Sequence, residues 1–138
     1  MLSYLVYISY RKLSDNANEI EEILKSALKN NPSHEITGVL LYSTHKFIQY
    51  LEGGYEDVMW LYEKIKQDNR HEYMVLLSVG NIETRVFPNW YMGNKHLPSD
   101  EVDFLTDINA QDKITLKKLL KGEEHDAQKI QKIFQKFF

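Results

Sequence analysis

Short apolar runs alternate along the chain with segments of helical periodicity. Residues 2–9 (LSYLVYIS) and 36–43 (ITGVLLYS) are apolar at both odd and even positions, which is typical of strands buried on both faces. A short turn separates the second run from residues 47–54 (FIQYLEGG), which predict an antiparallel third strand. Residues 73–79 and 87–92 predict a fourth strand and a short fifth one.

Two segments between these strands carry apolar residues at i, i+3, i+4 and i+7, the spacing of an amphipathic helix. The first helix is expected to begin at a capping pair, Asn16 and Glu19, and to end at Asn30 and Asn31. It ends there because Pro32 pushes the residue before it out of helical geometry. The core stripe of the second helix consists of Val58, Leu61, Tyr62 and Ile65.

The order strand, helix, strand, strand, helix, strand, strand predicts an α/β (α+β) fold. It is a ferredoxin-like, five-stranded mixed sheet with two helices on one face, because right-handed crossovers place both helices there. The gap between two such helices is a natural crevice for a small molecule. Gly38 inside the second strand predicts a bend or a close approach to the backbone.

The chain changes character after Leu97, so we expect a domain at residues 1–97 and a C-terminal helical extension, or cap, at residues 98–138. Lysines interleave with acidic residues in this second block, which favours solvated helix faces over a nucleic-acid or membrane patch. Its apolar stripes should pack on the exposed face of the sheet or on a second subunit. They comprise Val102, Phe104, Leu105 and Ile108, then residues 114–120, then Ala127, Ile130, Ile133, Phe134 and Phe137.

Composition narrows the class of protein. A chain of 138 residues suits one domain with a real core, and a net charge of -3 argues against general affinity for nucleic acid or an anionic membrane. No apolar run approaches the roughly 20 residues that span a bilayer, and the N-terminus lacks the features of a signal peptide. The absence of cysteine removes disulfides and thiolate chemistry. We therefore expect a cytoplasmic protein.

The sequence carries little sign of catalysis. Its five histidines show no paired metal-ligand spacing, and no GxSxG elbow, P-loop or GxGxxG fingerprint is present. Arg11 follows the first strand, where an acylphosphatase on this plan needs an anion-binding loop, but the glycines of such a loop are missing. We expect neither an enzyme nor a metal site.

One amide interrupts an apolar strand face. Side chains alternate along a strand, so Gln49 lies between Phe47 and Leu51, and a buried amide needs definite partners. The simpler interpretation is a Gln that caps a backbone group. However, Tyr7 and the pair Asn30–Asn31 are also polar groups in apolar surroundings, and amides beside apolar walls suit a flat heterocycle with imide groups, such as a flavin.

These segments together resemble a BLUF domain, the family of blue-light sensors that use FAD. The matching pieces cover nearly all of residues 1–97 in the family's order and spacing. They are LVYIS with Tyr7, the helix ending NNP, ITGVLLYS, FIQYLEG, DNRH at residues 68–71 and FPNWYM at residues 87–92.

The resemblance implies photochemical roles. The residue matching Tyr7 gives an electron and a proton to the excited flavin, and the one matching Gln49 bridges that hydroxyl and the flavin N5 and O4 edge. Rearrangement of the Gln side chain shifts the absorption slightly to the red. Trp90 and Met92 match fifth-strand residues that pass the signal outward, with simple core packing as the alternative for both.

The resemblance also implies a set of cofactor-binding residues. Asn31 and Asn30 match the amides at the pyrimidine edge, and Ile23 and Phe47 match the residues that enclose the ring. The region associated with the ribityl and phosphate portion comprises Asp68, Arg70 and His71, and Lys64 departs from the family by standing where some relatives carry an Arg beside the phosphate. The expected cofactor is FAD, with FMN or riboflavin as substitutes on heterologous expression.

The partners implied are flavin, a homo-oligomer and an unidentified downstream protein, without direct contact to nucleic acid or membrane. The alternative function is a light-independent ligand- or protein-binding module on the same ferredoxin-like plan. A redox enzyme that uses the flavin is a third interpretation, weakened by the lack of an evident catalytic acid.

Overall fold

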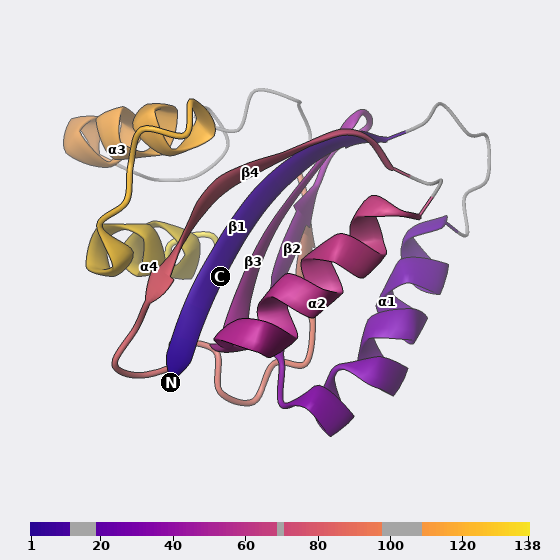
Figure 1. Ribbon diagram of the computed structural model, residues 1–138. Coiled ribbons are helices and arrows are strands. Elements are labelled where there is room, and N and C mark those ends of the chain that lie inside the picture. Colours follow the sequence, from indigo (N-terminus) through magenta and orange to yellow (C-terminus); the bar gives the residue numbers. More distant parts are fainter. Residues whose placement is uncertain (12–18, 69–70, 98–108) are drawn as a thin grey trace.

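The computed structural model describes residues 1–11, 19–68, 71–97 and 109–138 and contains one five-stranded sheet (Figure 1). The strand order is β4-β1-β3-β2-β5. β1 pairs antiparallel with β3 and β4, β2 pairs antiparallel with β3, and β5 runs parallel to β2. The strands are β1 (Leu2–Arg11), β2 (Thr37–Tyr42), β3 (Lys46–Gly54), β4 (His71–Asn81) and β5 (Gly93–His96).

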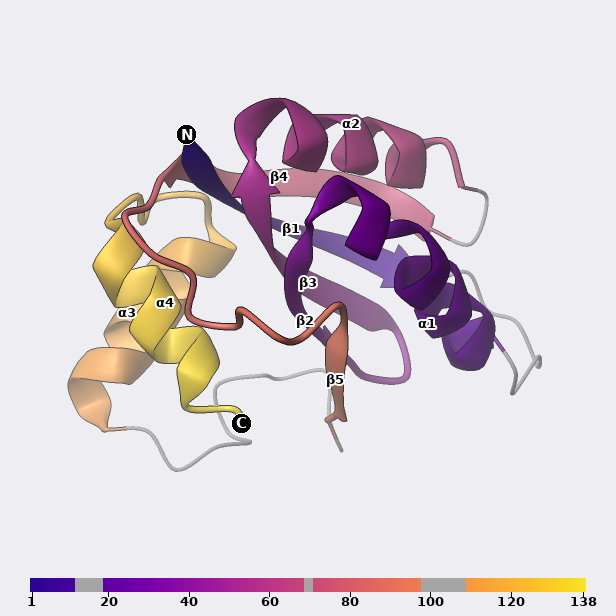
Figure 2. The same cartoon turned by 90° about the horizontal axis from the view of Figure 1, so that it is seen from below.

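Two helices, α1 (Glu19–Asn30) and α2 (Tyr55–Lys66), cover one face of this sheet (Figure 2). Their apolar stripes share a buried core with the sheet side chains of that face, including Leu5, Leu40 and Leu51. The ferredoxin-like arrangement with both helices on one face is thus confirmed. Each of the two helices has 12 residues, and none of the described helices is long and apolar enough to cross a membrane.

The opposite face of the sheet carries the C-terminal cap, α3 (Ala110–Leu120) and α4 (Ala127–Gln135) (Figure 2). Asn109 and Asp126 cap the two helices by accepting hydrogen bonds from backbone N–H groups. The apolar residues of the cap join the second core of the sheet, where Phe134 stacks on Tyr50 with ring centroids 5.0 Å apart. For the apolar stripes within residues 109–138, packing on the sheet face is confirmed.

Some expected features lie outside the described residues. These are the capping residue Asn16 and the first apolar stripe of the C-terminal block, Val102, Phe104, Leu105 and Ile108.

The position of the fifth strand was predicted wrongly. Residues 87–92 form turns and bends, and β5 begins only at Gly93, opposite Val39 of β2. Pro88 has no N–H to donate, and Trp90 N bonds Phe87 O at 3.3 Å, which closes a turn in place of a strand ladder. The fourth strand also runs further than expected and includes Gly80.

Gly38 marks a close approach, as its position in β2 suggested. A Cβ atom at this residue would lie 2.0 Å from the carbonyl oxygen of Tyr50 on β3, so only glycine fits there. The Gly38 N–H donates to Trp90 O at 2.8 Å. The second strand is therefore tied both to β3 and to the segment before β5.

Candidate functional site

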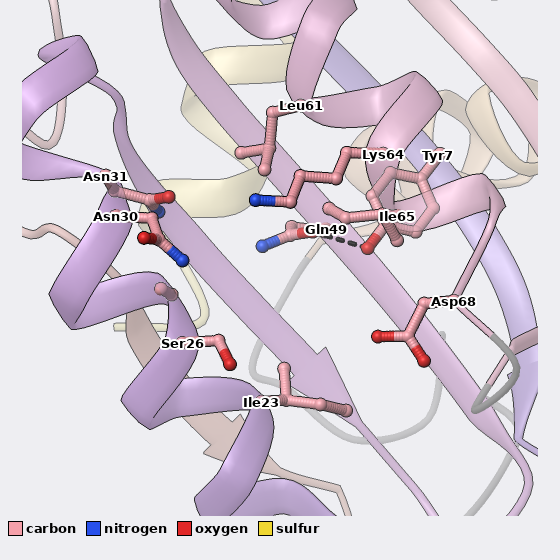
Figure 3. Close-up of a pocket in the computed structure, with 11 residues that line it drawn as sticks. Tyr7, Ile23, Ser26, Asn30, Asn31, Gln49, Leu61, Lys64, Ile65 and Asp68 are labelled. Carbon is pink, nitrogen blue, oxygen red and sulfur yellow. Dashed lines mark hydrogen bonds between the residues drawn. The ribbon is translucent and has the colours of Figure 1, made fainter.

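A cavity of about 210 Å³ opens between α1, α2 and the sheet (Figure 3). Seven residues singled out from the sequence line this cavity together. They come from β1, α1, β3 and α2 and from the residues just after the ends of the two helices. They are Tyr7, Ile23, Asn30, Asn31, Gln49, Lys64 and Asp68. The predicted crevice therefore exists, in the predicted place.

A chain of hydrogen bonds runs from the floor of the cavity, formed by Tyr7 on β1 and Gln49 on β3, to the segment before β5. Tyr7 and Gln49 are direct partners in the β1–β3 register, and the Tyr7 hydroxyl donates to Gln49 Oε1. Gln49 Nε2 in turn donates to Met92 Sδ at 3.1 Å. A thioether is a weak acceptor, and a primary amide has two donor hydrogens, so the Gln49 amide retains hydrogen-bonding capacity toward the cavity.

The Tyr7 hydroxyl is held in its protonated form. Its side chain is 1% exposed, and burial raises its pKa far above the ordinary value, with a further increase from the negative charge of Asp68 and from Tyr62. The Tyr62 ring meets the Tyr7 ring edge-on, with centroids 5.8 Å apart. At neutral pH the site therefore holds one phenolic proton, hydrogen-bonded to an amide oxygen.

Two consecutive amides meet the cavity where α1 ends. Asn31 is 2% exposed, and its Nδ2 donates to Tyr91 O at 2.9 Å, so this amide also fixes the segment before β5. The Asn30 side chain points from the last residue of α1 toward the cavity (Figure 3). Ile23 lies on the same helix two turns earlier and supplies an apolar wall.

Charged groups occupy the rim on the side of α2. Lys64 is exposed, whereas Asp68, just beyond the end of the helix, is half-buried. Of the other residues expected in this region, Arg70 lies outside the described residues, and His71 is described only as the first residue of β4.

Phe47 and Trp90 do not line the cavity. Phe47 is fully buried in the core between the sheet and the two helices. Trp90 is 40% exposed and packs on Phe87 and Phe138, with ring centroids 5.3 and 5.2 Å away. In this structure Met92 therefore faces Gln49, and Trp90 faces the C-terminal cap.

The sequence analysis did not assign four further lining residues to the site. They are Ser26, Ala27, Leu61 and Ile65. Helical spacing could have found them, because 23, 26, 27 and 30 form one face of α1, and 61, 64, 65 and 68 form one face of α2 and its end.

Sequence reasoning also missed Glu52, which organises the opposite face of the sheet. Its side chain is fully buried, and its oxygens accept hydrogen bonds from Val86 N and Phe87 N at 2.8–3.0 Å. They also accept from the Tyr50 hydroxyl at 2.9 Å and from Gln131 Nε2 at 3.4 Å. Glu52 thus joins β3, the β4–β5 connection and α4.

The residues of the cavity fit a flat heterocycle. The walls come from aliphatic side chains of two facing helices, such as Ile23 and Leu61, while amides stand at one end and on the floor. Amides offer donors and acceptors side by side, as an imide edge requires. The fold and the site together define a module with a cavity for a small flat molecule on a ferredoxin-like sheet.

Comparison with known proteins identifies the family of this module. The family profile described as BLUF, "Sensors of blue-light using FAD", matches residues 2–93. The chain belongs to the BLUF family, and its matched residues form a blue-light photoreceptor module that uses a flavin.

Similar proteins include both long and short chains. The chain is 32% identical over 100 residues to photoactivated adenylate cyclase subunit beta of Euglena longa, covering 71% of this chain but 12% of the relative. It is 38% identical over 87 residues to the blue light- and temperature-regulated antirepressor BluF of Escherichia coli K12, covering 63% of this chain and 22% of the relative. The solved structure of BlsA in its photo-activated state aligns with a TM-score of 0.71 and 27% identity, covering 98% of this chain and 93% of that one.

Proposed function

We propose that this chain binds FAD non-covalently, with the flavin ring in the cavity between α1 and α2, and that Tyr7 and Gln49 convert blue light into a change of hydrogen bonding. The observation that carries the proposal is the continuous path from the Tyr7 hydroxyl through the Gln49 amide, two groups that line the cavity, to Met92 Sδ. Asn30 and Asn31 supply amides for the polar edge of the ring, and Ile23 supplies an apolar wall.

A bound flavin would supply light absorption and, when excited, an acceptor for one electron and one proton. Tyr7 would give its electron and its hydroxyl proton to that acceptor, and both would return to Tyr7 on recombination. The proton is available because burial keeps the Tyr7 pKa high and the hydroxyl protonated in the dark. While Tyr7 is oxidised, its hydroxyl no longer donates to Gln49 Oε1, so the amide is free to rearrange and present a different pattern of donor and acceptor.

The signal leaves the site through the segment before β5. Rearrangement of Gln49 breaks its bond to Met92. The neighbouring residues Trp90 and Tyr91 accept hydrogen bonds through their backbone carbonyls, from Gly38 of β2 and from Asn31 just after α1. Trp90 in turn contacts Phe138 of the cap. We therefore propose Met92 as the first output residue and Trp90 as the second.

We propose that residues 1–97 form the sensor and residues 98–138 a cap, and that the chain itself catalyses no reaction. The cyclase and antirepressor relatives are much longer than this chain, and the match covers 12% and 22% of their length. In those proteins the activities in their names are therefore expected to reside in regions outside the sensor. A homo-oligomer and a separate downstream protein are the proposed partners. Light scattering in the dark and under blue light tests the oligomer, and a monomer in both states refutes it.

The function is tested by visible absorption spectra before and after blue light. We expect a flavin band that shifts slightly to the red and recovers in the dark. Tyr7→Phe and Gln49→Ala should retain flavin but lose this light-minus-dark difference. Tyr62→Phe is the matched control, because it removes a neighbouring hydroxyl from a ring that contacts Tyr7 and leaves the Tyr7–Gln49 bond intact.

Three results count against this proposal. A wild-type difference spectrum in either Tyr7→Phe or Gln49→Ala contradicts the assigned roles. Protein without flavin after expression in a flavin-sufficient host contradicts the cofactor and favours the light-independent binding module. Flavin reduction by NAD(P)H favours a redox enzyme.

A further inference from the structure

An exposed tryptophan stands beside the rim of the flavin cavity. Trp60 lies one turn before Lys64 on α2 and is 42% exposed. The Lys64 ammonium sits 5.0 Å from the centre of the Trp60 ring, and the His34 ring lies 4.4 Å from it at an angle of 30°. His34 Nδ1 is 3.5 Å from Asp57 Oδ1. Trp60 is thus held between the turn after α1 and the cation at the rim.

Among the described residues, Lys64 is a cation without a carboxylate partner. No Asp or Glu oxygen of those ranges is within 4.0 Å of its ammonium, and its one ring contact there is Trp60. A lysine side chain is a point charge on a flexible four-carbon stem, so its position is fixed only by what it touches. An ammonium over an indole face is attracted by the ring quadrupole, and Trp is the strongest aromatic partner for it.

The size of the cavity places the rest of the cofactor outside it. Pockets that bury most of a drug-sized ligand measure roughly 300–1,000 Å³. The present cavity, at about 210 Å³, suits a ring system but not a whole dinucleotide. A phosphorylated side chain must therefore leave at the rim, where Lys64 from α2 and Ser26 from α1 are the exposed lining residues.

We propose that Trp60 is a positioning residue that holds the Lys64 ammonium at the cavity rim, so that the site selects phosphorylated flavins over riboflavin. The inference rests on the proposed function, because it concerns the same cavity and the same class of ligand. Trp60 acts through Lys64 and does not itself contact the flavin ring. Trp60 therefore affects the preference among flavins, and this effect should disappear when Lys64 is replaced by an uncharged residue.

The test is a competition between two ligands that differ only by a phosphate. The full-length protein is freed of flavin, equilibrated with equal concentrations of riboflavin and FMN, and separated from unbound ligand, and the retained flavins are quantified. The FMN-to-riboflavin ratio is the readout, because a defect in folding lowers the retention of both. The variants are Trp60→Leu, Lys64→Met and their combination, with Tyr55→Leu as the control for loss of an exposed aromatic from the same helix.

We expect Lys64→Met to lower the ratio and Trp60→Leu to lower it by about two- to fivefold, the range for an exposed cation–π contact. The combined variant should be no lower than Lys64→Met alone, because Trp60 has no effect without the charge. Tyr55→Leu should match the wild type.

Three outcomes overturn the role of Trp60. They are an unchanged ratio in Trp60→Leu, an equal loss of both flavins, or a further drop when Trp60→Leu is added to Lys64→Met. A wild-type protein that retains neither flavin refutes the proposed function together with this inference. Retention of flavin with an unaltered ratio in the variants refutes only the inference.

Discussion

Replacing Glu52 changes a fully buried hydrogen-bond network that ties the sheet to the β4–β5 connection and the cap. Glu52→Ala removes both oxygens and leaves the N–H groups of Val86 and Phe87 and the Tyr50 hydroxyl without their acceptor. An unsatisfied buried polar group costs roughly 1–3 kcal/mol. Because Val86 is half-buried and water can reach it, we expect a total loss of about 3–5 kcal/mol in the free energy of unfolding.

Glu52→Gln tests the loss of a carboxylate oxygen and its charge while the size of the side chain stays almost the same. A glutamine has one acceptor oxygen, and its NH₂ group must face donors, so it cannot serve the backbone N–H groups and the Tyr50 hydroxyl together. The hydroxyl can rotate, which leaves one or two bonds lost and a cost of about 1–3 kcal/mol. The three proteins should therefore rank wild type, Glu52→Gln, Glu52→Ala in decreasing stability.

Urea unfolding measures the effect. A lower midpoint with an unchanged slope reports a loss of stability without a change in the surface exposed on unfolding. Glu83→Gln is the matched control, since Glu83 is an exposed carboxylate in the same connection and should shift stability by no more than about 0.5 kcal/mol. A loss below about 1 kcal/mol in Glu52→Ala would refute the reasoning, because it would mean that the N–H groups find other acceptors.

Three further predictions concern the sheet and the cavity floor. Burial raises the pKa of Tyr7 and Tyr50, so the folded state retains protons that the unfolded chain releases near pH 10. The urea midpoint should therefore be constant just below that pH and fall as the pH rises above it. An increase of the midpoint above about pH 10 would contradict the burial of these hydroxyls. Gly38→Ala should destabilise by more than about 2 kcal/mol in thermal melting, because its Cβ would lie 2.0 Å from Tyr50 O, and an unchanged melting temperature would rule out this approach. Met92→Leu removes the sulfur acceptor of Gln49 at a stability cost below about 1.5 kcal/mol, yet should change the dark absorption or the recovery rate; identical values for both would argue against the contact.

The periodicity of the sequence was sufficient for most of the fold. Alternation and helical spacing depend on local geometry, so the order of strands and helices followed from the pattern of apolar residues. The placement of both helices on one face followed from the handedness of crossovers. The fifth strand was misplaced because the aromatic residues at 87–92 favoured a strand, although Pro88 already argued against one; the turn that Trp90 N closes on Phe87 O was not visible in the sequence.

For the candidate site, too, the sequence indicated the residues and the tertiary structure brought them together. Polar groups at apolar positions of the sequence pointed to Tyr7, Gln49 and the pair Asn30–Asn31, and the tertiary structure brings all four to one cavity. The expected position of Phe47 beside the ring remains a prediction, since that residue does not line the cavity.

By itself, the sequence determined the kinds and order of the elements, the strand face on which Gln49 lies between Phe47 and Leu51, and the family motifs, because each of these depends on spacing along the chain. The tertiary structure decided that Met92 and not Trp90 meets Gln49, that Glu52 gathers donors from three elements, and that Trp60 holds Lys64 near His34. These contacts join residues from separate elements, and strand register and helix docking place them. Such placement depends on how the whole core packs, which no local pattern records.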